Sequence, residues 1–578
     1  MTVDNSNTYE EKGLLSQIED ATGLQNGELE QATNDNRPRL RGRTLTYTLA
    51  FVAGTGFTLF GYDQGVMSAL LTANQFERVF PQVNTEAHPN HATLQSFVVA
   101  IYEIGCLMGA LSNLWVGDKL GRRKTIVLGG CIMIIGAILQ TASISYAMLV
   151  VARIITGFGN GINTSTVPSY HCECSPATKR GSNIMIEGSL ITLGIMISYV
   201  SIPSVLLRSC PADHFASYWI DFAFFFVSGS TAQWRVPIAF QIILALLMIA
   251  GIGFLPESPR WLVKHGRHAE ALSVICALDD KDISDPEVQR TYIAIYETVV
   301  AEGGFGSEPT NLSELFTHGR SQNFRRAALA VTSQCFQQIT GINIITYYAT
   351  ILFQRLGLSD INSRIVAACN GTEYFLASLI AIFIIERVGR RRLMLYSAVG
   401  QTITMILLAI LGSINNSAAQ VISCVLLFVF NSIFALGWLG MTWLYPAEIV
   451  GLRIRAPANA LSTASNWIFN FMVVMVTSPS FENISWGTYI VFASLNAFIF
   501  PIVYFFFPET AGRSLEDMDV VFALAHNEGV SPVKVSLRKD VPPAGSREAD
   551  IILGISDSSA RKKDESSVIV QDEKRRKN

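Results

Sequence analysis

Two residues of opposite charge interrupt long apolar runs of the chain. Asp63 stands in FTLFGYDQG, and Arg153 stands in LVVARIITGFGNG. An ionisable group at such depth in an apolar segment is costly and is functional by default. We hypothesise that the two side chains pair and that protonation of Asp63 releases Arg153, so that proton binding is coupled to a movement of the helices. A static structural ion pair is the alternative.

A group of side-chain amides lies in QCFQQITGINIITYYA. Gln334 and Gln338 share one helix face by their i, i+4 spacing, and Gln337 lies near that face. Amides both donate and accept hydrogen bonds, which suits a polyhydroxyl ligand. Hydrogen bonds between helices are the alternative use of such amides. Aromatic side chains expected to pack on the carbon skeleton of a ligand are Tyr347, Tyr348, Trp443 and Trp467.

The elements that position these residues are predicted to be membrane helices. The chain has 578 residues, of which 50% are hydrophobic and only 15% are charged. This is too apolar for a soluble protein of this length, and it is enough for about a dozen spans of ~20 residues. We therefore predict an all-α membrane protein with twelve spans. They lie near residues 45–68, 94–116, 125–143, 147–170, 183–199, 234–254, 327–354, 364–385, 393–413, 420–445, 457–477 and 487–507.

The composition argues against several other functions. A net charge of −3 provides no field for binding nucleic acid. The nine cysteines include no CxxC pair, and HCEC at 171–174 is weak evidence for a metal, so we expect no metal site. We find no nucleophile–base arrangement and no glycine-rich phosphate loop, so we expect neither an enzyme nor a cofactor. The polar N-terminus has no apolar core of a cleaved signal peptide.

Lysine and arginine are concentrated in every second loop, which orients the chain. Because basic loops remain in the cytoplasm, both termini and the central linker are predicted to be cytoplasmic. Disorder is predicted after about residue 525 from the charged, polar composition. The basic segments are Arg37–Arg43, Lys119–Lys124, Lys179–Arg180, 256–325, Arg387–Arg392, Arg453–Arg455 and Arg513. The predicted units are an N-terminal tail (1–43), a six-helix bundle (44–255), a linker with short helices (256–325), a second bundle (326–507) and a C-terminal tail (508–578).

The chain repeats its own motifs at matching helix ends. GDKLGRRK corresponds to ERVGRRRL, ECSPATKRG to EIVGLRIRA, and PESPRWL to PETAGRSLEDMD. Two six-helix halves with matching motifs indicate parallel repeats with a binding site between them near mid-membrane. Acids and bases at these helix ends can pair across helices, hold the halves together and break again in a cycle. Anchoring by positive charge alone explains the basic residues but not the recurring acids.

These motifs carry a family resemblance. The chain from about residue 45 to 520 resembles a sugar porter of the major facilitator superfamily, through GDKLGRRK, PESPRWL, QQITGIN and PETAGRSLE in this order. FTLFGYDQG, IEGS and WIDF resemble fungal sugar and polyol transporters, particularly yeast glycerol–proton symporters. The resemblance implies the twelve-helix major facilitator fold and a plasma-membrane carrier with a monomeric functional unit. Such a carrier takes up a sugar or polyol with a proton by alternating access.

The resemblance also implies roles for individual residues. Proton-coupled members have an aspartate on helix one and an arginine on helix four, which correspond to Asp63 and Arg153, whereas facilitative relatives lack the aspartate. The implied substrate cavity is lined by Gln337, Gln338, Asn343, Trp443 and Asn466. The implied inner gate consists of Asp118, Arg122, Glu173, Arg180, Glu257, Arg260, Glu386, Arg390, Glu448, Arg455 and Glu509.

Two positions depart from the pattern of hexose porters. Gly188 stands where those porters have a glutamine, and Met441 and Thr442 precede Trp443 where they have prolines. The loss of one amide favours a smaller or differently shaped polyol over glucose. Glu187 is either a second titratable group or a cytoplasm-facing residue near the start of its helix.

The first half is longer than the second because of residues 199–217. Arg122 and Glu257 are 135 positions apart, whereas Arg390 and Glu509 are 119 apart. Deletion of 199–217 leaves GIMISYWIDFAFFF, a continuous helix end. The codons permit splice sites at both ends, so we hypothesise a translated intron, which sequencing of the transcript tests. A genuine insertion in the outer loop is the alternative; in both cases its charged side chains cannot face lipid.

Two other functions of the protein remain as alternatives. A facilitative sugar carrier would share the fold but would not couple to protons. A membrane nutrient sensor would bind a sugar and signal through its tail without transport. A paired Asp63 and Arg153 favours proton coupling over both, because neither alternative uses a titratable pair in the membrane.

Overall fold

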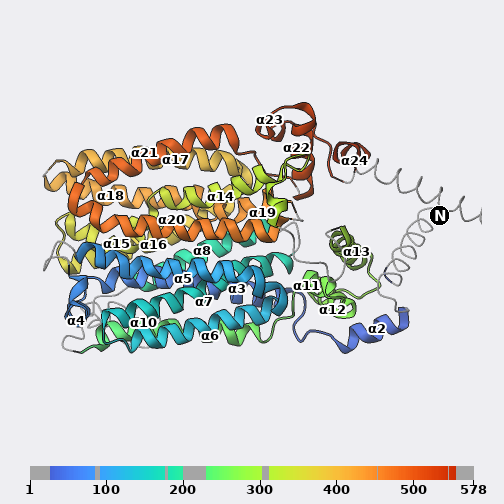
Figure 1. The fold of residues 1–578 in the computed structure, drawn as a ribbon, viewed down its shortest axis with the longest axis horizontal. Coiled ribbons are helices and arrows are strands. Elements are labelled where there is room, and N and C mark those ends of the chain that lie inside the picture. Colours follow the sequence, from blue (N-terminus) through green and yellow to red (C-terminus); the bar gives the residue numbers. More distant parts are fainter. Residues whose placement is uncertain are drawn as a thin grey trace, which may run out of the picture.

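The computed structural model describes residues 18, 26–84, 91–175, 180–199, 230–301, 312–414, 416–451, 454–513, 515–544 and 546–554. These residues form helices and loops, and the described part of the chain contains no strand. Two helical bundles lie side by side, with the N-terminal bundle in blue to green and the C-terminal bundle in yellow to red (Figure 1). The predicted all-α membrane fold is therefore confirmed.

Each of the twelve predicted spans corresponds to a helix or to a broken pair of helices. Nine helices in the described residues are long and apolar enough to cross a membrane. The N-terminal bundle contains α3 (Gly42–Leu70), α5 (His91–Leu120), α6 (Arg122–Thr141), α7 (Tyr146–Glu173), α8 (Arg180–Tyr199) and α10 (Ala232–Ile252), with α4 (Asn74–Val79) and η1 (Pro81–Val83) between α3 and α5. The C-terminal bundle contains α14 (Asn323–Ile339), α15 (Ile342–Arg355), α16 (Asp360–Val388), α17 (Arg390–Gly412), α18 (Ser417–Phe434), the π-helix η5 (Ala435–Leu439), α19 (Met441–Ile449), α20 (Arg455–Ile484) and α21 (Gly487–Phe506).

The remaining helices lie at one end of the two bundles, which we call the linker end (Figure 1). The opposite end, where α4 lies, is called the far end. The linker-end helices are α2 (Asn26–Asp35), α11 (Pro259–Lys264), α12 (His268–Asp279), α13 (Pro286–Ala301), α22 (Leu515–Glu528), α23 (Pro532–Ser536) and α24 (Arg547–Leu553). A short 3-10 helix, η4 (Leu312–Phe316), precedes α14.

The prediction of disorder after about residue 525 is wrong for the described part of the tail. Helix α22 continues to Glu528, and α23 and α24 follow it. Asp519 on α22 pairs with the buried Arg326 of α14, and the guanidinium of Arg326 lies over the ring of Phe522. Apolar side chains of α22 also pack on Val535. These contacts hold the polar tail against the bundle, which composition alone does not reveal.

Glycine permits the close crossing of α5 and α7. A Cβ atom on Gly157 would lie 2.1 Å from the carbonyl oxygen of Tyr102, so no larger residue fits there. Small residues allow membrane helices to approach closely and to pack through their backbones. Arg153 lies one turn before Gly157 on α7, and its Nη2 donates a hydrogen bond of 3.1 Å to the carbonyl oxygen of Val99 on α5. The crossing therefore sets the position of this buried cation.

Two spans of the C-terminal bundle are broken near their middle. Gly341, with φ of +91°, separates α14 from α15, and the π-helix η5 separates α18 from α19. Glycine adopts such a φ without strain. Discontinuous helices in transporters free backbone groups where they line a binding site, and single π-turns often mark functional sites. Both breaks lie next to the cavity described below.

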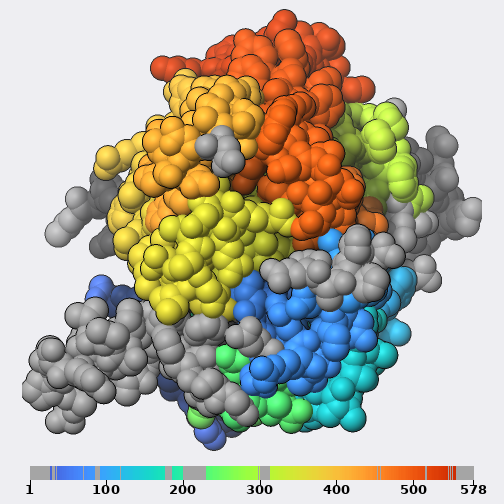
Figure 2. Space-filling view, turned by 90° about the vertical axis from the view of Figure 1, so that its left-hand side faces the viewer, coloured from blue at the N-terminus to red at the C-terminus, as the bar shows by residue number. Residues whose placement is uncertain are grey.

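The two bundles meet through α3, α5 and α8 of the first half and α15, α16 and α20 of the second. Hydrogen bonds cross between the halves toward the far end. Thr72 accepts from Arg364 at 2.6 Å, and Tyr348 Oη lies 3.2 Å from Ser96 Oγ. Figure 2 views this end, where the blue surface of the first helices lies against the yellow surface of the second half. Apart from Tyr199, the last residue of α8, the suspected insertion 199–217 lies outside the described residues.

Candidate functional site

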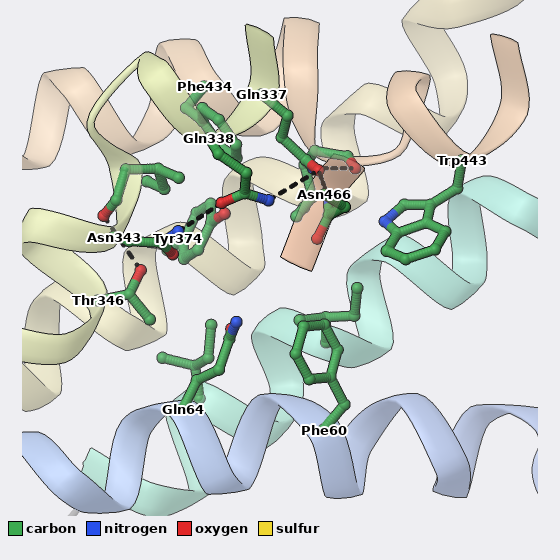
Figure 3. Close-up of a pocket in the computed structure, with 14 residues that line it drawn as sticks. Phe60, Gln64, Gln337, Gln338, Asn343, Thr346, Tyr374, Phe434, Trp443 and Asn466 are labelled. Carbon is green, nitrogen blue, oxygen red and sulfur yellow. Dashed lines mark hydrogen bonds between the residues drawn. The ribbon is translucent and has the colours of Figure 1, made fainter. Parts of the chain in front are cut away.

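A small cavity lies between the two bundles (Figure 3). Its volume is about 30 Å³, which is room for about two water molecules. The site is therefore nearly closed in this conformation, and a ligand larger than a few water molecules requires side chains or helices to move apart. The lining residues come from α3 and α8 of the first half and from α14, α15, α16, α18, η5, α19 and α20 of the second.

The structure brings all five residues of the predicted substrate cavity together. Gln337, Gln338, Asn343, Trp443 and Asn466 line this one cavity although they come from four helices. Gln337 and Gln338 lie before the break at Gly341 and Asn343 lies after it, so the break directs amides from both segments toward the cavity. Their role as ligands of a substrate stays a prediction.

The amides form a connected network. Asn466 Nδ2 donates to Gln337 Oε1 at 2.8 Å and to Gln334 Oε1 at 2.6 Å. Gln338 Nε2 donates to Gln337 Oε1 at 3.3 Å, and Asn343 donates to Gln338 Oε1. Buried polar groups need such partners, and substrate hydroxyls of matching geometry can take the place of these bonds. The network suits a ligand that both donates and accepts.

Sequence reasoning missed several residues of the cavity. Gln64 and Phe60 of α3 face the amides from the other half (Figure 3). Thr346 and Tyr374 complete the polar part of the lining. A signal for Gln64 was present, because it follows Asp63 directly and stands one helical turn after Phe60. The sequence does not show which residues of the first half face the amides across the cavity.

Three of the four aromatic residues expected to pack on a ligand do not line the cavity as described. Only Trp443 does. Trp467 is fully buried and packs against Phe60, with ring centroids 5.2 Å apart. Tyr347 donates a hydrogen bond to Glu103 on α5, and Tyr348 donates one of 3.2 Å to the carbonyl oxygen of Val474. The expectation for these three is wrong because each ring is turned toward another helix.

Gly188, which stands where hexose porters have a glutamine, packs closely against the second half of the protein. A Cβ atom on Gly188 would lie 3.2 Å from the Cα atom of Gly440, at the start of α19. This contact is tighter than ordinary van der Waals distance, so the backbone of the second half must shift by a few tenths of an ångström to admit a side chain at this position. Glu187, beside it, is buried rather than facing water, and its Oε1 lies 2.5 Å from His171 Nδ1. His171 and Glu187 therefore form a second buried titratable pair.

Asp63 and Arg153 form the predicted pair. Asp63 Oδ2 lies 3.8 Å from Arg153 Nη2, and both side chains have an exposed fraction of 0%. The guanidinium also lies over the ring of Tyr102, 5.0 Å from its centroid. Burying two charges is expensive, and removing one partner leaves the other uncompensated. Asp63 precedes the cavity residue Gln64, so the pair and the cavity share helix α3.

The inner-gate residues of the first half form one cluster at the linker end. Arg122 pairs with Glu173 at 3.0 Å, which joins α6 to α7. Glu257 Oε1 accepts hydrogen bonds from the backbone N–H groups of Arg122 at 3.0 Å and of Ser258 at 3.0 Å. Glu173 also lies within electrostatic reach of Arg260. The cluster thus ties the ends of α6, α7 and α11 to one another.

The second half repeats this arrangement. Arg390 pairs with Glu448 at 3.0 Å and with Glu386 at 2.7 Å. Glu509 Oε1 accepts from the backbone N–H of Arg390 at 2.8 Å, as Glu257 does from Arg122. Arg455 donates to the carbonyl oxygen of Val450 at 3.3 Å. The motif repeats in the sequence therefore correspond to repeated hydrogen bonds.

These ion pairs join helices of the same half, whereas the sequence predicted pairs between halves. The pairs Arg122–Glu173 and Arg390–Glu448 each lie within one bundle. Sequence motifs identify which helix ends carry charge but not which neighbour receives it. The side chains of Asp118 and Arg180 lie outside the described residues. The inner-gate role of the whole set stays a prediction, and in the described residues no His, Cys, Asp or Glu group suits a metal.

Two helical bundles around a central polar cavity, each with the same charged motif at its linker end, define a membrane transporter of the major facilitator fold. The profile of the family described as "Sugar (and other) transporter" matches residues 49–522. The chain belongs to this family. Its members are transporters and not enzymes.

Individual relatives agree with this membership. The chain is 39% identical to the sugar transporter STL1 of Saccharomyces cerevisiae over 505 residues, which cover 86% of this chain and 84% of the relative. It is 39% identical to the MFS-type transporter oryC of Aspergillus oryzae over 495 residues, which cover 84% and 87%. The solved structure of the proton:xylose symporter XylE from E. coli superposes with a TM-score of 0.67 at 23% identity, covering 83% of this chain and 99% of XylE. The similarity to XylE establishes the fold.

Proposed function

We propose that this protein is a secondary active transporter that takes up a sugar or polyol together with a proton by alternating access. The observation that carries the proposal is the fully buried pair of Asp63 and Arg153 on a helix that also lines the cavity. A titratable carboxyl at this depth is costly, and a proton that binds there changes the pairing of Arg153. Movement of α3 then links proton binding to the state of the cavity.

Alternating access requires contacts that close each end in turn. We define the outer gate as the far-end contacts between α3 or α5 of the first half and α15 of the second, which include Ser68–Thr350 and Ser96–Tyr348. In this conformation the outer gate is closed, and the ion pairs at the linker end lie within each half. Rocking of two rigid bundles about a central site would open one end while the other closes.

We assign the linker end to the cytoplasm and the outer gate to the exterior. The support is the concentration of arginine and lysine in the loops at the linker end, since basic loops are retained in the cytoplasm. Both termini are then cytoplasmic, and the membrane is the plasma membrane. A single chain contains both halves around the cavity, so the functional unit is a monomer.

We propose a polyol or small sugar as substrate. The amides of Gln337, Gln338 and Asn343 suit hydroxyl groups, and Trp443 offers an apolar surface to a carbon chain. Gly188 lacks the amide that hexose porters carry at this position, and its close contact with Gly440 disfavours a larger residue there in this conformation. The relative STL1 is itself described as a sugar transporter.

Uptake measurements test the proposal and separate it from a facilitative carrier and from a sensor. Labelled glycerol, xylose and glucose are offered to cells that lack their own carriers, and external pH is recorded on substrate addition. A proton symporter accumulates substrate against its gradient and makes the medium more alkaline. Equilibration without alkalinisation identifies a facilitative carrier, and binding without uptake identifies a sensor.

A further inference from the structure

A second buried acid lies beside the Asp63–Arg153 pair. Glu103 stands on α5 in the run IYEIGC, and its exposed fraction is 0%. Glu103 lies within electrostatic reach of both Arg153 and Asp63. An ionisable residue inside a membrane helix is functional by default. Neither the ion pair nor the amide network described above uses this residue.

The described contact of Glu103 reaches into the other half of the protein. Its Oε1 accepts a hydrogen bond from Tyr347 Oη of α15, and its Oε2 has no hydrogen-bond partner among the described residues. Tyr347 is fully buried and lies on the segment that follows the break at Gly341. The bond therefore links the buried charges of the first half to the helix that carries the cavity residue Asn343 and contributes to the outer gate.

The charges of this group do not balance if both acids are ionised. Asp63, Glu103 and Arg153 are all removed from solvent, and they comprise two carboxyls and one guanidinium. An uncompensated buried charge is strongly unfavourable. Asp63 has the guanidinium 3.8 Å away, whereas Glu103 is bonded to a neutral phenol. The negative charge therefore belongs on Asp63 and the proton on Glu103 in this conformation.

We propose that Glu103 is a second proton-binding carboxyl and that its bond to Tyr347 permits the outer gate to close only after a proton has been bound. This inference rests on the proposed proton symport. With the outer gate open, Tyr347 leaves Glu103, and Glu103 takes a proton from external water. Closure then buries a neutral acid. That proton then passes from Glu103 to Asp63, which leaves Asp63 neutral and Glu103 ionised. Arg153 changes its ion-pair partner from Asp63 to Glu103. The net charge of the three residues stays the same.

The surroundings of Glu103 agree with a site that exchanges a proton rather than a fixed ion pair. The charged and titratable groups that face it are Asp63 of α3, Arg153 of α7, Cys106 of its own helix and Tyr347 of α15. The ring of Tyr102, also on α5, lies beneath the guanidinium of Arg153 and close to Asp63. Arg153 is the one basic group in this set, so a single proton decides which acid it pairs with.

The substitution Glu103→Gln tests the proposal. Glutamine imitates the protonated acid, keeps an oxygen for Tyr347 and cannot bind or release a proton. In the wild type, uptake at low substrate concentration falls as external pH rises, by up to about tenfold per pH unit for one proton. The variant should transport substrate with no such dependence between about pH 5 and pH 8 and should not make the medium alkaline. Glu103→Asp, which retains an acid, should restore a pH dependence.

Glu373→Gln is the matched control. Glu373 is an acid in the membrane helix α16, and it is bonded to Ser432 of its own half rather than across the halves. This control should keep the wild-type pH profile and alkalinisation. If the Glu103→Gln variant also keeps the wild-type pH profile and alkalinisation, the proposed role of Glu103 is wrong, whereas the proposal of proton symport stands. A wild type without alkalinisation overturns both proposals.

Tyr347→Phe provides a second test if Glu103→Gln does not reach the membrane. This variant keeps all three ionisable residues, Asp63, Glu103 and Arg153, and removes only the hydroxyl that contacts Glu103. Closure of the outer gate then no longer depends on whether Glu103 carries a proton. Fewer protons should therefore enter per substrate molecule than in the wild type. An unchanged ratio of protons to substrate in a well-expressed Tyr347→Phe variant overturns the proposal.

Discussion

Asn466 donates a hydrogen bond to Gln337 at the wall of the cavity, with Asn466 Nδ2 lying 2.8 Å from Gln337 Oε1. The two residues belong to α20 and α14, so the amides that we expect to bind substrate also join these two helices in this conformation. A substrate hydroxyl must replace such bonds with bonds of similar strength. The net gain for each hydrogen bond is then modest, which fits a carrier that has to release its substrate again.

Replacement of Gln338 by alanine should weaken substrate binding without preventing folding. Gln338 contacts Gln337 and Asn343, so its loss removes one expected ligand of the substrate and two hydrogen bonds of the network. An unmade buried hydrogen bond costs about 1–3 kcal/mol, which lowers affinity by about one to two orders of magnitude. Binding of labelled substrate to purified protein measures this. Gln354→Ala, on the far part of α15, is the control and should bind as the wild type does. Unchanged affinity of Gln338→Ala would remove Gln338 from the site.

Asp63→Asn should uncouple substrate movement from protons. The asparagine keeps the size of the side chain but cannot titrate, and Arg153 keeps Glu103 within electrostatic reach as an alternative partner. Accumulation against a gradient and alkalinisation should be lost, while exchange of labelled for unlabelled substrate continues because the amides are untouched. Both are measured in the same cells. Asp360→Asn, at the exposed start of α16, should retain coupling. Full alkalinisation by Asp63→Asn would contradict the proposal.

Arg390→Ala should destabilise the second bundle. The guanidinium of Arg390 is 5% exposed and pairs with Glu448 and Glu386, so its removal leaves neighbouring carboxylates without a cation. Breaking such a buried pair costs about 3–5 kcal/mol. The thermal unfolding temperature of the purified protein should fall. Arg387→Ala, an exposed arginine on the preceding turn, should unfold like the wild type. Equal unfolding temperatures of the two variants would exclude a structural contribution of the cluster.

Tags at the linker and at the C-terminus test the orientation. A protease site inserted at residue 290, within α13, and one after residue 578 should both be cleaved only when the membrane is opened. The reason is that basic loops stay on the cytoplasmic side. A tag in the loop after α17, near Ser413, should be cleaved in intact cells. Cleavage of either of the first two sites from outside would reverse the assignment.

Several features of this protein could be predicted from the sequence because they depend on one segment at a time. Hydropathy located each of the twelve spans on an observed helix or broken helix, with ends that differ by up to seven residues, since a helix in lipid must be apolar over the thickness of the membrane. Repeated motifs identified two equivalent halves, and the depth of Asp63 and Arg153 in apolar runs was enough to predict their pairing. Spacing in QCFQQITGIN placed several amides near one face.

Other features were decided only when the helices packed. Nothing in the sequence shows that Tyr347 turns away from the cavity to reach Glu103, or that Gln64 faces the amides of the other half. The rotation of each helix depends on close crossings such as that of Gly157 on Tyr102, which are contacts between distant segments. The motifs likewise predicted charged helix ends, but the neighbours decided that Arg122 and Arg390 pair within their own halves. Periodicity and depth describe one helix, whereas partners are set by the packing free energy of all helices together.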